Sequence, residues 1–143
     1  MSHILEYAKQ FIDTPESYAS LTQISSMLGG TKQFDMKAKD YGLPDFAFIH
    51  LEILMWEAMS VRSGAITYYE VLNADRQEHT QTVLRLMKQD ELLEVYSMGI
   101  GKHENDEVMD KVDDWIKNNE SEIIAFIANN VRANRDELLN LFA

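Results

Sequence analysis

Carboxylates at helical spacing are the residues of this chain with the clearest capacity for chemistry. Between Glu104 and Glu122 there are eight acidic and two basic residues, a local net charge of −6. Successive residues of a helix are about 100° apart, so five of these carboxylates share one side. We call this set the acidic face: Asp106, Glu107, Asp110, Asp113 and Asp114. The opposite side is apolar, with Val108, Val112, Trp115 and Ile116.

The acidic face supports two interpretations. It is either a solvated surface that keeps the protein soluble, or a binding surface for a positively charged partner. Duplex DNA has one phosphate charge per about 1.7 Å of axis when both strands are counted. Carboxylates about 5–6 Å apart at Cβ can therefore occupy a basic DNA-binding groove, guided by the field that attracts DNA.

A second group of polar residues lies in or near the most apolar segment of the chain. Glu52 and Glu57 interrupt the apolar run of residues 44–62, and Tyr68 and Tyr69 follow it. A buried carboxylate must find a partner or shift its pKa, so these four residues form a candidate pocket for an enzyme or a small-molecule binder. The alternative is that both glutamates reach the helix edge and pair with Lys, Arg or backbone amides.

The remaining motifs indicate no catalysis, metal or cofactor. None of the four histidines, His3, His50, His79 and His103, lies three or four residues from another. The Glu-x-x-His pattern of di-iron helical proteins is absent. Gly99-Ile100-Gly101-Lys102 lacks the hydroxyl residue and the preceding strand of a phosphate loop. We therefore expect a protein that is not an enzyme.

The composition of the chain excludes some kinds of site and disfavours some kinds of partner. The chain has 143 residues, a net charge of −11 and no cysteine, which excludes disulfides and thiolate metal sites. The negative charge disfavours direct binding to nucleic acid and to anionic membranes. The segment Met1–Glu6 lacks the basic and apolar regions of a secretory signal, so we expect a cytoplasmic protein.

The spacing of apolar residues predicts one compact all-α domain, residues 1–143, of about seven to nine helices with short loops. Thr14 with Pro15, Asp75, and Asn105 or Asp106 are expected to cap helices. Residues 44–62 are apolar on nearly all sides, so this helix is expected to be central to the core or covered by a second subunit. Residues 31–43 hold three lysines and are expected to form a loop.

The order of these segments resembles a bacterial family of small, acidic, all-helical proteins, one of whose members is described as a DNA mimic. The resemblance covers roughly residues 45–131. Ser63, Ala65 and Ile66 stand where that family has Asn, Gly and Phe. The parallel segments are Leu51-Glu52 through Glu57, Ser63 to Asn73, Val83 to Met87, Met109 to Trp115, and Phe126 to Asn130. The resemblance implies an all-α fold, no catalysis, a homodimer and a protein partner, such as a transcription regulator.

Three hypotheses follow from the sequence. The first is an acidic interaction protein and inhibitor, a DNA mimic that places the acidic face in the basic surface of a DNA-binding protein. The second is an immunity protein or antitoxin that neutralises a basic nuclease. The third is a small-molecule binder or enzyme that uses Glu52, Glu57, Tyr68 and Tyr69.

Overall fold

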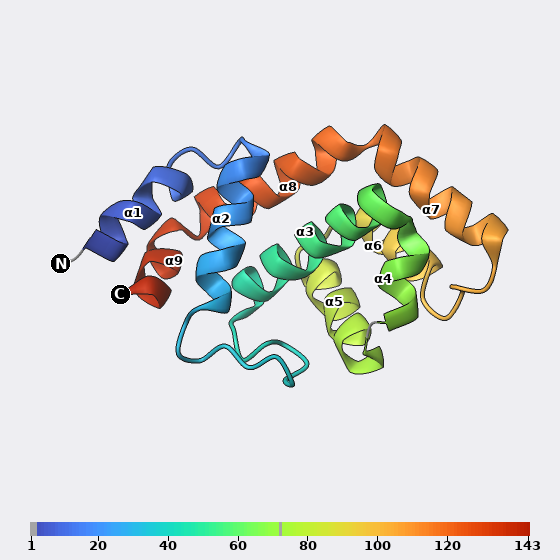
Figure 1. Cartoon of the computed structure of the whole chain (residues 1–143), viewed down its shortest axis with the longest axis horizontal. Helices are drawn as coiled ribbons and strands as arrows, with labels where there is room; N and C mark the ends of the chain where they lie inside the picture. The colour runs from blue at the N-terminus through green and yellow to red at the C-terminus, as the bar shows by residue number, and fades with distance from the viewer. Residues whose placement is uncertain (1–2, 72) are drawn as a thin grey trace. The chain divides into compact units, whose positions relative to one another are not determined.

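The computed structural model describes residues 3–71 and 73–143, and all regular structure in these ranges is helical (Figure 1). This confirms the predicted all-α class and number of helices. The nine helices of the described residues are α1 (His3–Ile12), α2 (Tyr18–Gly29), α3 (Asp45–Ser63), α4 (Ala65–Val71), α5 (Ala74–Leu86), α6 (Asp90–Met98), α7 (Asp106–Asn118), α8 (Glu120–Ala133) and α9 (Arg135–Phe142).

Two helix starts differ from the predicted ones, and both differences come from capping. Ser17, rather than Thr14, caps α2, because its hydroxyl accepts a hydrogen bond from the Ser20 N–H at 3.1 Å. Asn73, rather than Asp75, caps α5, because its side-chain oxygen accepts hydrogen bonds from two amides of the first turn. Asn105 caps α7 as predicted.

The internal contacts of the chain divide it into two compact units. The first comprises Met1–Leu54 and Ser121–Ala143, and the second comprises Met55–Glu120. Helix α3 contributes its first half to one unit and its second half to the other. A single domain over residues 1–143 therefore stays a prediction.

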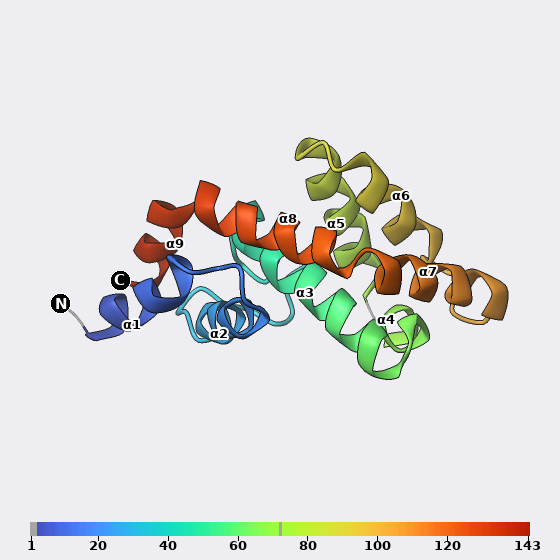
Figure 2. The same cartoon turned by 90° about the horizontal axis from the view of Figure 1, so that it is seen from above.

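In the first unit, α1, α2 and α9 pack against one another, and Figure 2 shows α1 beside α9. The apolar stripes of these helices supply buried residues such as Ile12, Leu21 and Leu138. Arg135 of α9 forms a two-pronged ion pair with Asp13, with nitrogen–oxygen distances of 2.6 and 3.2 Å. This ion pair ties the start of α9 to the residue that follows α1.

In the second unit, α5 packs on α6, while α7 packs on both α4 and α6. Two residues of the predicted apolar side of α7, Val112 and Ile116, are at most 1% exposed. Val108 and Trp115 are only half-buried, and Met109, which the spacing did not place on that side, is buried at 4% exposure. The same spacing leaves four of the five carboxylates of the acidic face exposed, Asp113 being the exception. No helix of the described residues is long and apolar enough to cross a membrane.

Candidate functional site

Helix α7 holds the predicted acidic face in a defined conformation. At its start, the Asn105 side-chain oxygen accepts a hydrogen bond from the Val108 N–H at 3.1 Å. At its end, the Asn119 amide donates to the Trp115 carbonyl at 2.8 Å. Asp106 and Glu107 lie in the first turn and Lys117 in the last, which matches the helix dipole at both ends. The face is therefore presented on a helix that is capped at both ends.

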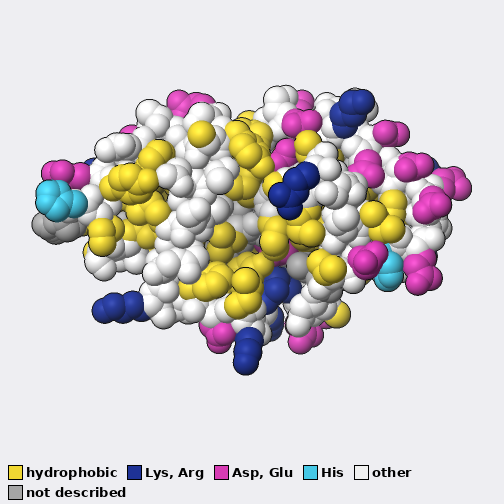
Figure 3. Space-filling view, in the orientation of Figure 1, with side chains coloured by type: hydrophobic (Ala, Val, Ile, Leu, Met, Phe, Trp, Pro, Cys, Tyr) yellow, Lys and Arg dark blue, Asp and Glu magenta, His cyan; other side chains and the backbone are white. Residues whose placement is uncertain are grey.

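Four of the five predicted residues are exposed, namely Asp106, Glu107, Asp110 and Asp114. Figure 3 shows acidic side chains gathered over the part of the surface where α7 lies in Figure 1. Lys111 approaches Glu107 at 3.9 Å, but both side chains are exposed, and such a pair contributes little. The outward surface of α7 thus keeps most of its negative charge.

Asp113, the fifth predicted residue, has a different position. Its carboxylate accepts a hydrogen bond from the backbone N–H of Ala65, the first residue of α4, at 2.7 Å. Partial burial raises the pKa of Asp113, the Ala65 hydrogen bond lowers it, and the negative charges of Asp110 and Asp114 raise it further. Asp113 therefore joins α7 to the start of α4 and is a poorer phosphate surrogate than the other four.

Two substitutions separate the hydrogen bond of Asp113 from its charge. Because an amide oxygen can still accept from Ala65 and carries no charge, we expect D113N to be more stable than the wild type at pH 7. The advantage should vanish as pH falls and Asp113 becomes protonated, since a raised carboxyl pKa favours the protonated form in the folded state. D113A removes the hydrogen-bond acceptor, so its free energy of unfolding should be about 1 kcal/mol lower than that of the wild type, as when a helix cap is lost. Urea unfolding measures the stability of both variants. Equal effects of D113N and D113A would contradict the structural role given to the Asp113–Ala65 hydrogen bond.

Tyr68 and Tyr69 lie in the core of the second unit. The Tyr69 hydroxyl donates to the Tyr96 carbonyl at 2.8 Å and accepts from the Trp56 indole N–H at 2.9 Å. The Tyr68 and Tyr96 hydroxyls are 2.7 Å apart, in hydrogen-bond contact. All four rings are at most 4% exposed, and burial raises the pKa of Tyr69. The hydroxyls of these tyrosines therefore form hydrogen bonds within the cluster, as buried tyrosine hydroxyls generally do.

One interpretation expected the two glutamates of α3 to reach the exposed edge of the helix. They do not: the exposed fraction is 0% for Glu52 and 3% for Glu57. Glu52 belongs to the first unit, where it accepts a hydrogen bond from the Tyr41 hydroxyl at 2.7 Å. Glu57 belongs to the second unit with Tyr68 and Tyr69. Glu52 is thus tied to an aromatic residue of the loop of residues 31–43, a partner that helical spacing could not indicate.

His50 is a buried titratable group that sequence reasoning missed. It lies on α3 at 1% exposure, with Nε2 3.0 Å from the Leu21 carbonyl oxygen. Burial lowers its pKa to about 4, although the hydrogen bond to Leu21 opposes the shift. The only sequence signal was its place inside the apolar run of residues 44–62. His50 is neutral at physiological pH and is part of the core of the first unit.

The pKa of His50 predicts an acid-sensitive fold. Its folded pKa of about 4 lies below the ordinary value of 6.5, so protons bind the unfolded chain preferentially. The contribution of neutral His50 to the free energy of unfolding is therefore fully present above pH 6.5. It is lost as pH falls toward 4, by about 3 kcal/mol in all. Urea unfolding across this range should show a shallower pH dependence for H50Q than for the wild type. H103Q, which alters a more exposed histidine, should keep the wild-type slope, and an unchanged slope in H50Q would contradict the assignment.

The described residues contain no group of three or more His, Asp or Glu side chains that could hold a metal ion. Comparison of the whole chain with protein-family models, curated proteins and solved structures finds no match. The candidate site is therefore defined by its own geometry: four exposed carboxylates on one side of α7, with Asp113 beneath them anchoring α4.

Proposed function

We propose that this protein binds a basic protein partner through the acidic face of α7, without catalysis, and that it does so as a DNA mimic. The observation that supports this proposal is the exposure of Asp106, Glu107, Asp110 and Asp114 on one capped helix. The resemblance of residues 45–131 to a family that includes a DNA mimic favours the same function.

The density of charge along α7 is close to that of a nucleic-acid strand. A helix rises about 1.5 Å per residue, so Asp106 and Asp114 are separated by about 12 Å along the axis. Four exposed carboxylates over this length correspond to about one charge per 4 Å. A DNA strand has one phosphate per about 3.4 Å, so a groove built for a strand meets a comparable row of charges.

The construction of the site also favours binding. Buried Met109, Val112 and Ile116 hold α7 on its neighbours, and the Asp113–Ala65 hydrogen bond fixes it to α4. A surface ordered in advance loses little conformational freedom on association. Ile66 is 36% exposed, and its side chain and that of Asp113 both border Gly64. An apolar contact is therefore available beside the charges.

A competition experiment tests the proposal. Proteins captured by the wild-type chain from a lysate of its source organism would be purified, and each would be bound to its labelled DNA duplex. A DNA mimic should release the duplex at a stoichiometry near one to one and should do so less effectively as salt rises. A captured nuclease that is inhibited would define the partner as a toxin. Binding that leaves the duplex in place would contradict mimicry.

A further inference from the structure

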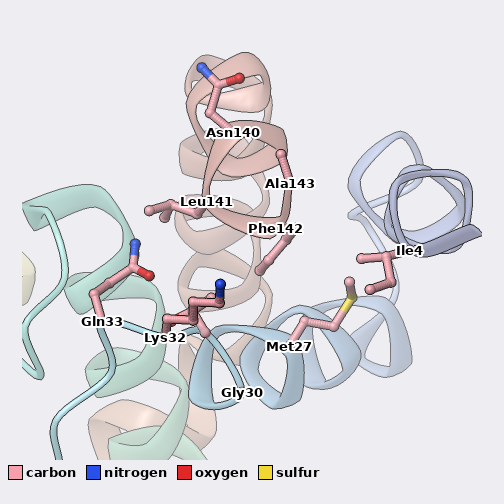
Figure 4. A pocket seen from close by; sticks show the side chains of 10 residues that line it. Ile4, Met27, Gly30, Lys32, Gln33, Asn140, Leu141, Phe142 and Ala143 are labelled. Atoms are coloured by element: carbon pink, nitrogen blue, oxygen red, sulfur yellow. The ribbon is translucent and has the colours of Figure 1, made fainter. Parts of the chain in front are cut away.

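A surface cavity of about 510 Å³ lies between the ends of three helices of the first unit, whereas α7 belongs to the second unit. Its walls come from α1, from the end of α2 with the loop that follows, and from α9 (Figure 4). This volume lies within the range of about 300–1,000 Å³ that is typical of small-molecule sites. The acidic face of α7 has no part in it.

The lining of the cavity is divided between apolar and polar side chains. Figure 4 shows Ile4 and Met27 pointing toward each other, and Phe142 projecting from α9 into the space between α9 and α2. Lys32 and Gln33 extend from the loop after α2 on the other side of the cavity. Ile4 is 59% exposed, so a large part of its apolar surface is not covered by the described chain.

Lys32 is the one charged side chain in the lining. No carboxylate pairs with it in residues 3–71 and 73–143. In a protein with a net charge of −11, a lysine without a carboxylate partner beside exposed apolar side chains favours a ligand that has both an anionic and an apolar part. The adjacent Gln33 amide supplies a further hydrogen-bonding group.

The loop that carries Lys32 and Gln33 is held in place by local contacts. The Asp35 N–H donates to the Tyr41 carbonyl at 2.8 Å, and the Phe34 and Tyr41 rings stack with centroids 5.4 Å apart. Gly42 adopts a φ of +71°, and a side chain there would overlap the Gln33 carbonyl. The backbone of this loop is therefore held by contacts of its own on the polar side of the cavity.

We propose that this cavity binds a linear aliphatic carboxylate, with its chain on Ile4, Met27 and Phe142 and its carboxylate toward Lys32. Each CH₂ group added to the ligand should strengthen binding by about two- to fourfold until the cavity is filled, since buried apolar area drives association. The carboxylate contributes less, because an ion pair at an exposed lysine is weak and is screened by salt.

Titration of the full chain with hexanoate, octanoate and decanoate, below their micelle concentrations, tests the proposal by calorimetry and amide NMR. We expect affinity to rise along the series and the shifted amides to cluster at residues 4, 27, 32 and 142. K32Q should weaken decanoate binding by about fivefold at low salt and leave binding of 1-decanol unchanged. K37Q, which removes an exposed lysine of the same loop outside the lining, should bind decanoate as the wild type does.

Three outcomes would overturn the proposal that this cavity binds an aliphatic carboxylate. The first is that decanoate shows no saturable binding, and the second is that the amide shifts are confined to residues outside the cavity. The third is that K32Q and K37Q change the affinity for decanoate equally. Because none of these results depends on the partner of α7, failure here leaves the proposed DNA mimicry intact, and the reverse also holds.

Discussion

The double charge reversal D110K/D114K should weaken binding of the basic partner by about 100-fold while leaving the fold intact. Both side chains are exposed on α7, and neither forms an ion pair within the described residues. Reversal turns two attractive contacts into repulsive ones in a groove that is itself positive, and like charges across an interface are costly. Calorimetry or surface plasmon resonance with the purified partner measures the loss, and circular dichroism checks the fold.

The matched control is E91K/E94K on α6. Glu91 and Glu94 are exposed acidic residues one turn apart in the same unit, so the control changes the net charge by the same amount. Long-range attraction falls equally in both variants, and only the local contact differs. We expect less than about threefold loss for the control at 0.15 M salt, where charges beyond about 8 Å are screened. Equal losses in the two variants would assign binding to net charge rather than to the acidic face.

G99A should destabilise the protein by about 3 kcal/mol. Gly99 ends α6, and a methyl group at this position would overlap the ring of Tyr69. The ring cannot move freely, because its hydroxyl is held by Trp56 and by the Tyr96 carbonyl. The cost combines overpacking with weakening of two buried hydrogen bonds. Urea unfolding measures it.

G29A supplies the control for this effect. Gly29 is the last residue of α2, and a methyl group placed there would meet no atom within 4 Å other than those of its chain neighbours and of its own helix backbone. Because Ala favours helix more than Gly does, G29A should leave the stability unchanged or raise it by up to about 1 kcal/mol. Comparable destabilisation by G99A and G29A would contradict the account of the Tyr69 cluster.

Local patterns in the sequence predicted the class of fold because helices leave a periodic signal. The apolar residues of α7 were found from their spacing, and Val112 and Ile116 are buried as expected. Asn105 caps α7 because a side chain of this type before an acidic turn satisfies the first amides. For the same reason, the exposure of four carboxylates on the opposite side followed from helical geometry.

Contacts between distant segments could not be predicted in this way. Asp113 and Ala65 are 48 residues apart, and Tyr69 and Tyr96 are 27 apart. No periodicity relates such pairs, so Asp113 was grouped with the exposed acids, and Tyr68 and Tyr69 with a pocket. The residue type of Asn73 alone does not say which helix it caps, and the structure assigns it to the start of α5.

Carbodiimide labelling of carboxylates, read residue by residue by mass spectrometry, tests the role of the acidic face most directly. In the complex with the partner, Asp106, Glu107, Asp110 and Asp114 should become protected, while Glu91 and Glu94 of α6 react as in the free protein. Asp113 should react slowly in both states, because its carboxylate is partly buried and hydrogen-bonded to Ala65. Unchanged labelling of the four exposed carboxylates in a stoichiometric complex would contradict the proposal that α7 is the partner-binding surface.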